Sequence, residues 1–140
     1  MKVREVMTES VETVAPDTAL SEAARMMRDL DTGFLPVGEN DRLVGTLTDR
    51  DIAIRAVAEG KDLGSATVRD AMSDHVRWVY EDQDTAEAAQ VMADHQIRRL
   101  AVLNRDKRLV GVLSQGDIAT RSSEDDLLGQ TVEQISRKGD

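Results

Sequence analysis

Apolar and polar residues follow a helical period in two stretches of the chain, near 19–30 and 85–95. The apolar residues on one helical face are Leu20, Ala23, Ala24 and Met27 in the first stretch and Ala88, Ala89 and Met92 in the second. Asp84 and Glu87 have the spacing of a capping box at the start of the second stretch. Both stretches therefore predict amphipathic helices.

Shorter apolar runs before and after each predicted helix have the length and composition of strands. An alternating run precedes each helix, and two runs joined by a turn-rich segment follow it. The predicted strands are Val11–Val14, Phe34–Val37 and Leu43–Leu47 in the first half, and Val76–Val79, Leu100–Leu103 and Leu109–Leu113 in the second. A short helical turn comes first in each half (Val3–Met7; Val68–Met72), and a last helix opens near Asp51 and near Asp117.

The two halves are copies of one unit, because five segments recur in order at an offset of about 65 or 66 residues. The matched pairs are Val3–Met7 with Val68–Met72, Glu22–Met27 with Glu87–Met92, Leu35–Val37 with Leu100–Val102, Leu43–Gly45 with Leu109–Gly111, and Asp51–Ala53 with Asp117–Ala119. We predict a first repeat over 1–60, a polar linker over 61–67, a second repeat over 68–121 and an acidic tail over 122–140 that is in part helical.

Composition narrows the classes of function. The formal net charge is −9, which disfavours nucleic-acid binding because that binding depends on neutralising phosphates. The chain has no cysteine, which excludes disulfides and thiolate ligands. No run approaches the ~18 apolar residues of a membrane span, and the first residues lack the apolar segment of a signal peptide. We therefore expect a soluble, cytoplasmic protein without a membrane partner.

The junction between the last strand and last helix carries the candidate chemistry in each repeat. A hydroxyl is followed three residues later by a carboxylate, as Thr48 and Asp51 and again as Ser114 and Asp117. A carboxylate can accept hydrogen bonds from the two hydroxyls of a ribose, and a hydroxyl with free backbone N–H groups can hold a phosphate. The same spacing is also that of an ordinary helix cap, and both interpretations stay open.

The doubled unit resembles the CBS domain, through Leu35-Pro36-Val37 on one strand and the segment LVGTLTDRDI (43–52) at the next strand-to-helix junction. Standalone bacterial proteins made of one CBS pair are the nearest in length. The resemblance implies an α/β (α+β) fold of two β-α-β-β-α repeats, packed sheet to sheet with pseudo-two-fold symmetry. Members of the family bind AMP, ADP, ATP, S-adenosylmethionine, NAD or no known ligand, so the resemblance is specific for the fold and not for the ligand.

Carried over by position, the resemblance makes Asp51 and Asp117 ribose ligands and Thr48 and Ser114 phosphate or ribose contacts. Binding members often carry a basic residue directly before the strand that begins at Leu100, where this chain has Arg98 and Arg99 and the first repeat has Gly33 and Phe34. The alternative is that the two arginines are a solvated pair balancing local acids. The predicted ligand-binding residues are Arg99, Ser114, Asp117 and Arg98 in the favoured second repeat, and Thr48, Asp51 and Arg50 in the first.

These features predict a regulatory module that binds an adenine nucleotide (AMP, ADP or ATP) in the cleft between the repeats and signals to a protein partner by conformational change. NAD and S-adenosylmethionine are less favoured ligands, and no cofactor is required. The resemblance favours a homodimer, and the alternative function is a ligand-free dimerisation scaffold. We expect no catalysis, because no nucleophile–base pair is evident, and no metal site, because His75 and His95 have no clustered partners.

Overall fold

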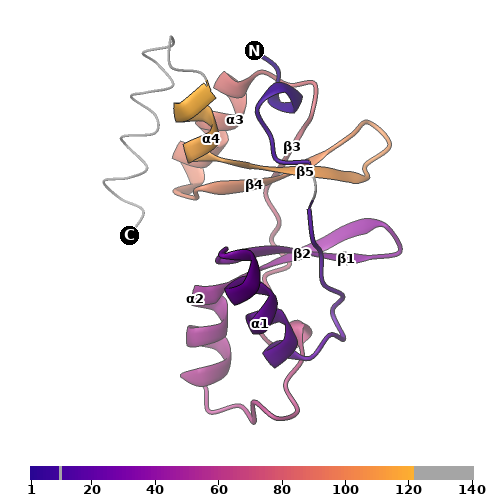
Figure 1. Ribbon diagram of the computed structural model, residues 1–140, viewed down its shortest axis with the longest axis vertical. Helices are drawn as coiled ribbons and strands as arrows, with labels where there is room; N and C mark the ends of the chain where they lie inside the picture. The colour runs from indigo at the N-terminus through magenta and orange to yellow at the C-terminus, as the bar shows by residue number, and fades with distance from the viewer. Residues whose placement is uncertain (10, 122–140) are drawn as a thin grey trace. The chain divides into compact units, whose positions relative to one another are not determined.

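The computed structural model describes residues 1–9 and 11–121 and divides the chain into two compact units. One unit is Glu12–Val76, and the other combines Met1–Val11 with the described residues from Arg77 onward. Each unit has its own small sheet and its own helices, which confirms the predicted α+β class (Figure 1). The predicted acidic tail at 122–140 lies outside the described residues.

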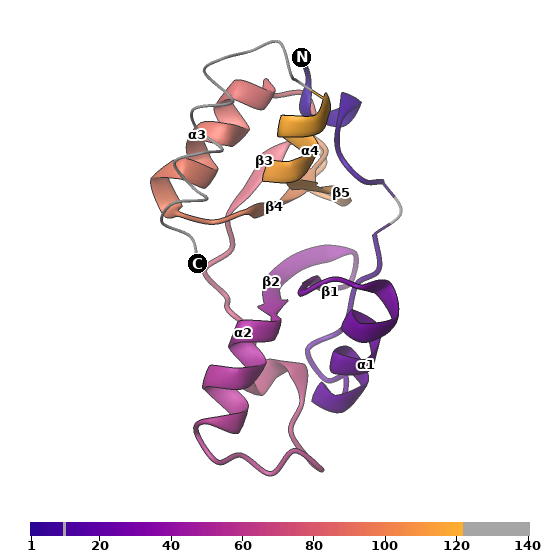
Figure 2. The same cartoon turned by 60° about the vertical axis from the view of Figure 1, so that its left-hand side comes forward.

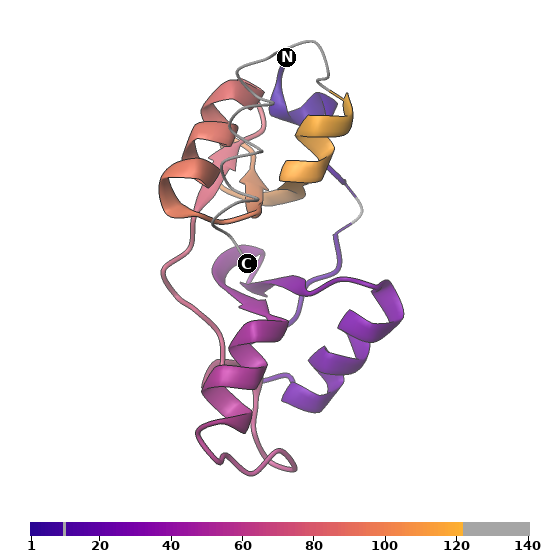
Figure 3. The same ribbon diagram turned by 90° about the vertical axis from the view of Figure 1, so that its left-hand side faces the viewer.

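The unit that contains most of the second repeat has a three-stranded sheet in the order β3-β4-β5. Strand β3 (Trp78–Tyr80) runs parallel to β4 (Arg99–Leu103), and β4 runs antiparallel to β5 (Leu109–Ser114). Helices α3 (Thr85–His95) and α4 (Gln115–Arg121) lie side by side in all three views (Figures 1, 2 and 3). The core between helices and sheet includes Val79, Ala88, Met92, Leu100, Val102, Leu113 and Ile118.

The other unit is built on a single hairpin, β1 (Phe34–Glu39) with β2 (Arg42–Thr48). Helix α1 (Leu20–Leu30) precedes the hairpin, and α2 (Asp49–Asp51) follows it and continues as a π-helix, η2 (Ile52–Val57). The core of this unit includes Val14, Leu20, Ala23, Met27, Leu35, Val37, Leu47, Ala56 and Val68. The predicted helices and hairpin strands are thus confirmed, and each hairpin strand extends beyond its predicted apolar run.

The ends of α1 and α3 have local causes. Each helix stops at a residue in the left-handed conformation, Asp31 (φ 52°) and Gln96 (φ 53°), which breaks the helical path. At its start α3 has the predicted capping box, in which the Asp84 N–H donates to Glu87 Oε1 at 3.3 Å. Helix α1 has Ala19 at its N-cap, which provides no side-chain hydrogen bond.

The opening helical turn of each repeat packs in the unit that contains the hairpin of the other repeat. The turn η1 (Val3–Glu5) is followed by Thr8, which exchanges two backbone hydrogen bonds with Val112 of β5, at 2.9 and 3.0 Å. The turn η3 (Val68–Asp70) is followed by Ser73, which makes the equivalent exchange with Thr46 of β2, at 2.9 Å each way. The compact units therefore do not coincide with the repeats of the sequence.

A glycine permits each of these close approaches. A Cβ on Gly111 would lie 2.8 Å from the Thr8 carbonyl oxygen, and one on Gly45 would lie 2.7 Å from the Ser73 carbonyl oxygen. Both obstacles are backbone atoms, so any side chain at these positions would push the paired segments apart.

The first strands of the two repeats differ, although their sequences alternate alike. Within residues 1–9 and 11–121, the run 11–14 makes only one bridge, in which the Val14 oxygen accepts from the Gly38 N–H at 2.9 Å and the Val14 N–H donates to the Pro36 oxygen at 3.2 Å. Its counterpart β3 pairs at three positions with β4. The predicted strand is thus reduced to a single residue in the first repeat.

Trp78 and Tyr80 on β3 are half-buried, whereas Val79 between them is in the core. Their rings pack edge to face with centroids 4.8 Å apart, and the Arg105 guanidinium lies 3.9 Å from the centre of the Tyr80 ring. Arg105 also makes two hydrogen bonds to Asp82, at 2.9 and 3.0 Å, and these hold the pKa of Asp82 below its ordinary value. These contacts fix the turn end of the β4–β5 hairpin, opposite the strand-to-helix junction.

Candidate functional site

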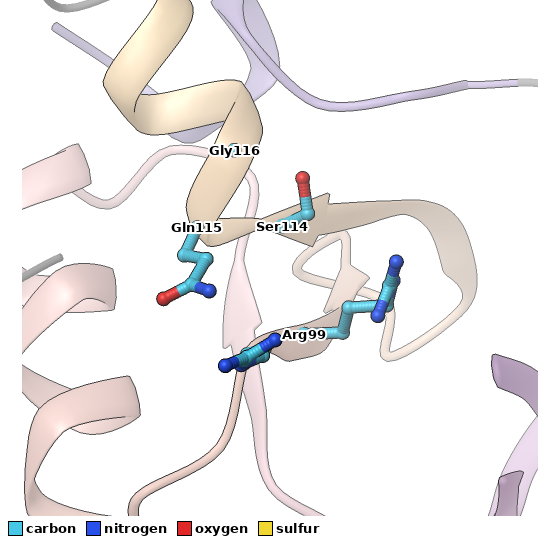
Figure 4. A pocket seen from close by; sticks show the side chains of 5 residues that line it. Arg99, Ser114, Gln115 and Gly116 are labelled. Carbon is cyan, nitrogen blue, oxygen red and sulfur yellow. The ribbon is translucent and has the colours of Figure 1, made fainter. Parts of the chain in front are cut away.

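A pocket of about 240 Å³ lies at the junction of β4, β5 and α4, and Figure 4 shows it from close by. Antiparallel pairing of Arg99 with Ser114 brings the first residue of β4 beside the last residue of β5. The pocket is lined by Arg98, Arg99, Ser114, Gln115 and Gly116. The arginine pair predicted to favour the second repeat therefore shares one pocket with the Ser114 junction.

Ser114 and Asp117 form a reciprocal cap at the start of α4. The Asp117 N–H donates to Ser114 Oγ at 3.0 Å, and the Ser114 N–H donates to Asp117 Oδ2 at 3.1 Å. The cap explanation of this spacing is therefore confirmed. It uses one carboxylate oxygen and one lone pair of the hydroxyl, so the Ser114 O–H can still donate to a ligand.

Gln115 was not among the predicted ligand-binding residues, although it lines the pocket. Its backbone N–H donates to the Arg98 oxygen at 2.9 Å, which fixes the junction to the start of β4. Its side-chain Oε1 is buried and has no hydrogen-bond partner among the described residues.

Gly116 leaves space at the first turn of α4. Among the described residues, a Cβ at this position would meet only the Ser114 hydroxyl, 3.6 Å away, at ordinary contact distance. The sequence signal for both Gln115 and Gly116 was present, because these two positions differ from Asp49 and Arg50 of the first repeat.

The first repeat forms the same junction with different side chains. Phe34 pairs with Thr48 as Arg99 pairs with Ser114, and the Asp49 N–H donates to the Gly33 oxygen at 3.0 Å. Thr48 and Asp51 cap α2 in the same way as the second pair, with hydrogen bonds of 2.9 and 3.0 Å.

The predicted site residues of the first repeat are all at this junction. Asp51 is held by the cap and lies 3.9 Å from Arg55 Nε. Arg50 is exposed, and its backbone N–H donates to Asp49 Oδ1 at 2.8 Å.

Two further features of the described part of the chain concern metal binding and membranes. Within residues 1–9 and 11–121, no group of three or more acidic or histidine side chains is placed to hold a metal ion. His75 Nδ1 lies 2.7 Å from its neighbour Asp74 at an exposed position. None of the helices in residues 1–9 and 11–121 is long and apolar enough to cross a membrane.

Comparison with known families gives a match over most of the chain. Residues 3–57 and 68–124 each match the model of the CBS domain. The chain is 38% identical over 136 residues to the CBS domain-containing protein YhcV of Bacillus subtilis, a match that covers 97% of this chain and 96% of that protein. It is 40% identical over 117 residues to hypoxic response protein 1 of Mycobacterium tuberculosis, covering 83% of this chain and 81% of that protein.

Solved structures with the same fold include complexes. The crystal structure of hypoxic response protein I with two coordinated zinc ions has a TM-score of 0.78 and 38% identity, covering 86% of this chain and 98% of that one. A structure of CBSX2 in complex with AMP has a TM-score of 0.77 and 25% identity, covering 88% and 96%. The CBS domain pair of MJ0100, in complex with 5-methylthioadenosine and S-adenosyl-L-methionine, has a TM-score of 0.78 and 25% identity, covering 87% and 99%.

Proposed function

Because this chain belongs to the CBS domain family and carries two such domains in tandem, we propose that it is a regulatory module that binds an adenine nucleotide through the Arg98–Gly116 pocket. The observation that carries the proposal is the pair of arginines that shares this pocket with the Ser114 junction. AMP bound to CBSX2, and the adenosine derivatives bound to MJ0100, support adenine-containing ligands for this family.

Charge supports an anionic ligand at this particular place. The chain as a whole carries a formal charge of −9, which repels a phosphate at long range, although salt screens much of that repulsion. Arg98 and Arg99 supply a local excess of positive charge, and a guanidinium can hold a phosphate with two parallel hydrogen bonds. This charge favours AMP, ADP or ATP over uncharged adenosine derivatives.

Size supports partial enclosure of the nucleotide. Pockets that enclose a whole small molecule occupy roughly 300–1,000 Å³, whereas this one occupies about 240 Å³. It suits the phosphate and the ribose, with the Ser114 hydroxyl as donor and Asp117 beside it as the ribose acceptor. The adenine ring then needs contacts beyond the pocket, and the predicted cleft between the repeats would supply them.

The signal we propose is a population shift. A nucleotide that binds one conformation better than another moves the equilibrium by its difference in binding free energy, and a partner protein or a second copy of the chain detects the change. The caps of both junctions are complete without a ligand, which is the observation behind the alternative of a ligand-free dimerisation scaffold. Neither function requires a catalytic step or a cofactor, and both are consistent with a cytoplasmic homodimer.

A thermal-shift panel tests the proposal. The ligands are AMP, ADP, ATP, NAD and S-adenosylmethionine, with and without magnesium. A ligand present at one hundred times its dissociation constant adds about 2.7 kcal/mol of stability, so a true ligand raises the melting temperature clearly. A flat panel with a well-folded protein would refute nucleotide binding and favour the scaffold.

A pair of arginine variants then locates the site. Arg99→Ala should weaken the binding of AMP at least tenfold, because a hydrogen bond to a charged group contributes about 1.5–3 kcal/mol. Arg108→Ala removes the same charge at the turn end of the same hairpin and should leave the affinity within about twofold. Equal losses in the two variants would show a general charge effect and exclude a site at Arg99.

A further inference from the structure

The junctions of the two repeats have the same backbone pairing but differ in charge. Register and backbone hydrogen bonds align Gly33 with Arg98 and Asp49 with Gln115. The four aligned positions 33, 34, 49 and 50 carry no net charge, whereas positions 98, 99, 115 and 116 carry two positive charges.

The Asp49 carboxylate occupies the space beside Gly33. A Cβ built on Gly33 would lie 2.6 Å from Asp49 Oδ2 and 3.0 Å from Oδ1, so both oxygens lie against the glycine backbone. Oδ1 also accepts the Arg50 N–H at 2.8 Å. The carboxylate therefore holds a hydrogen bond that an incoming anion would need, and it places a negative charge where that anion would lie.

The position of the Asp49 carboxylate depends on the absence of a side chain at Gly33. A side chain at position 33 would displace the Asp49 carboxylate, so glycine is the residue that leaves room for it. In the second repeat both members of the pair differ, since an arginine stands opposite a neutral glutamine. Replacement of this contacting pair by another pair changes both the charge and the free space of the junction.

From this juxtaposition we infer that Asp49 is a specificity-determining residue that excludes phosphate groups from the first repeat. The chain then binds one phosphorylated ligand, at the second repeat, and the first junction is closed to anions. This inference rests on the proposed function, because it assigns the nucleotide to one repeat and gives the reason for its absence from the other.

The first test locates binding by NMR on the full chain. Backbone amide resonances are followed during titration with AMP and, separately, with inorganic pyrophosphate. Resonances of Arg99, Ser114 and Gly116 should shift, and those of Gly33 and Asp49 should not. Shifts at both junctions with the same dissociation constant would overturn the inference while leaving the proposed function intact.

The second test opens the closed junction with the double variant Gly33→Arg/Asp49→Gln, which gives the first junction the residues found at positions 98 and 115 of the second. Pyrophosphate should now also shift resonances at 33 and 49, and the calorimetric stoichiometry should rise from one to two per chain. Asp41→Asn is the control, because it removes one negative charge at the turn of the same unit and should create no second site. A folded double variant without a second site would overturn the inference.

A reciprocal variant keeps the inference falsifiable if the double variant fails to fold. Gln115→Asp places a carboxylate in the second junction and should weaken the binding of pyrophosphate and of AMP at least tenfold. Unchanged affinity in Gln115→Asp would overturn the inference. Failure of AMP to shift any resonance at either native junction would instead refute the proposed function, and the pyrophosphate titrations of the double variant would still decide the role of Asp49.

Discussion

A single hydroxyl can serve both the fold and a ligand at each strand-to-helix junction. Ser114 Oγ accepts from the Asp117 N–H at 3.0 Å, and Thr48 Oγ1 accepts from the Asp51 N–H at the same distance. Acceptance uses a lone pair, so the proton of each hydroxyl can still be donated. A helix cap at this spacing is therefore compatible with ligand binding, and stability and affinity have to be measured separately.

Alanine variants of the two hydroxyls separate these roles. Thr48→Ala and Ser114→Ala should each lower the free energy of unfolding by about 1 kcal/mol, the usual cost of losing an N-cap, as measured by urea denaturation. Only Ser114→Ala should also weaken AMP binding in calorimetry, because the proposed ligand lies at the second repeat. An equal loss of affinity in both variants would contradict that assignment.

At the scale of single residues, alignment of the repeats predicted which positions of the two junctions are equivalent. Alignment of the copies placed Arg98 and Arg99 opposite Gly33 and Phe34, and the strand registers agree with it. The contact of Asp49 with Gly33 was not predictable, because it depends on a side-chain rotamer that residue spacing does not encode.

At the scale of elements, local periodicity determined most of the secondary structure. The apolar faces of α1 and α3 and the two hairpins follow directly from it. Periodicity does not identify the pairing partner of a segment, so the packing of η1 and η3 in the unit of the other repeat was not predicted. The reduction of run 11–14 to one bridge has the same cause, since alternation shows that a strand can form but not how much of it finds a partner.

The start of α1 offers a stabilising substitution at the element scale. Ala19 is at the N-cap without a side-chain hydrogen bond, while Glu22 already stands at the third helical position. Ala19→Ser would complete a capping box like that of α3 and should raise the free energy of unfolding by roughly 0.5–1 kcal/mol. Asp84→Ala, the matched loss at α3, should lower it by a similar amount. An unchanged free energy of unfolding in Ala19→Ser would show that the N–H groups at the start of α1 gain nothing from a side-chain cap.

At the scale of the whole molecule, the packing of η1 and η3 in the opposite units makes the stability of each repeat depend on the other. Val3 and Val68 occupy equivalent places in the repeats, and both are fully buried, but each lies in the core of the unit that contains the other repeat's hairpin. Loss of one opening turn should therefore weaken the opposite repeat.

Amide hydrogen exchange on a pair of matched variants tests whether each opening turn stabilises the unit in which it packs. Val3→Ala and Val68→Ala each remove two buried methyl groups and should cost about 2 kcal/mol. Exchange should accelerate chiefly in α3, β4 and β5 for Val3→Ala, and in α1, β1 and β2 for Val68→Ala, because native-state exchange reports the stability of each cooperative unit. If Val3→Ala instead accelerated exchange in β1 and β2, the opening turn of each repeat would stabilise its own repeat. The packing of η1 and η3 in the opposite units would then contribute little to stability. Acceleration in the opposite repeat would show that each repeat needs the opening turn of the other for its stability. A ligand at the Ser114 junction would then act on a unit that combines Met1–Val11 with the second repeat.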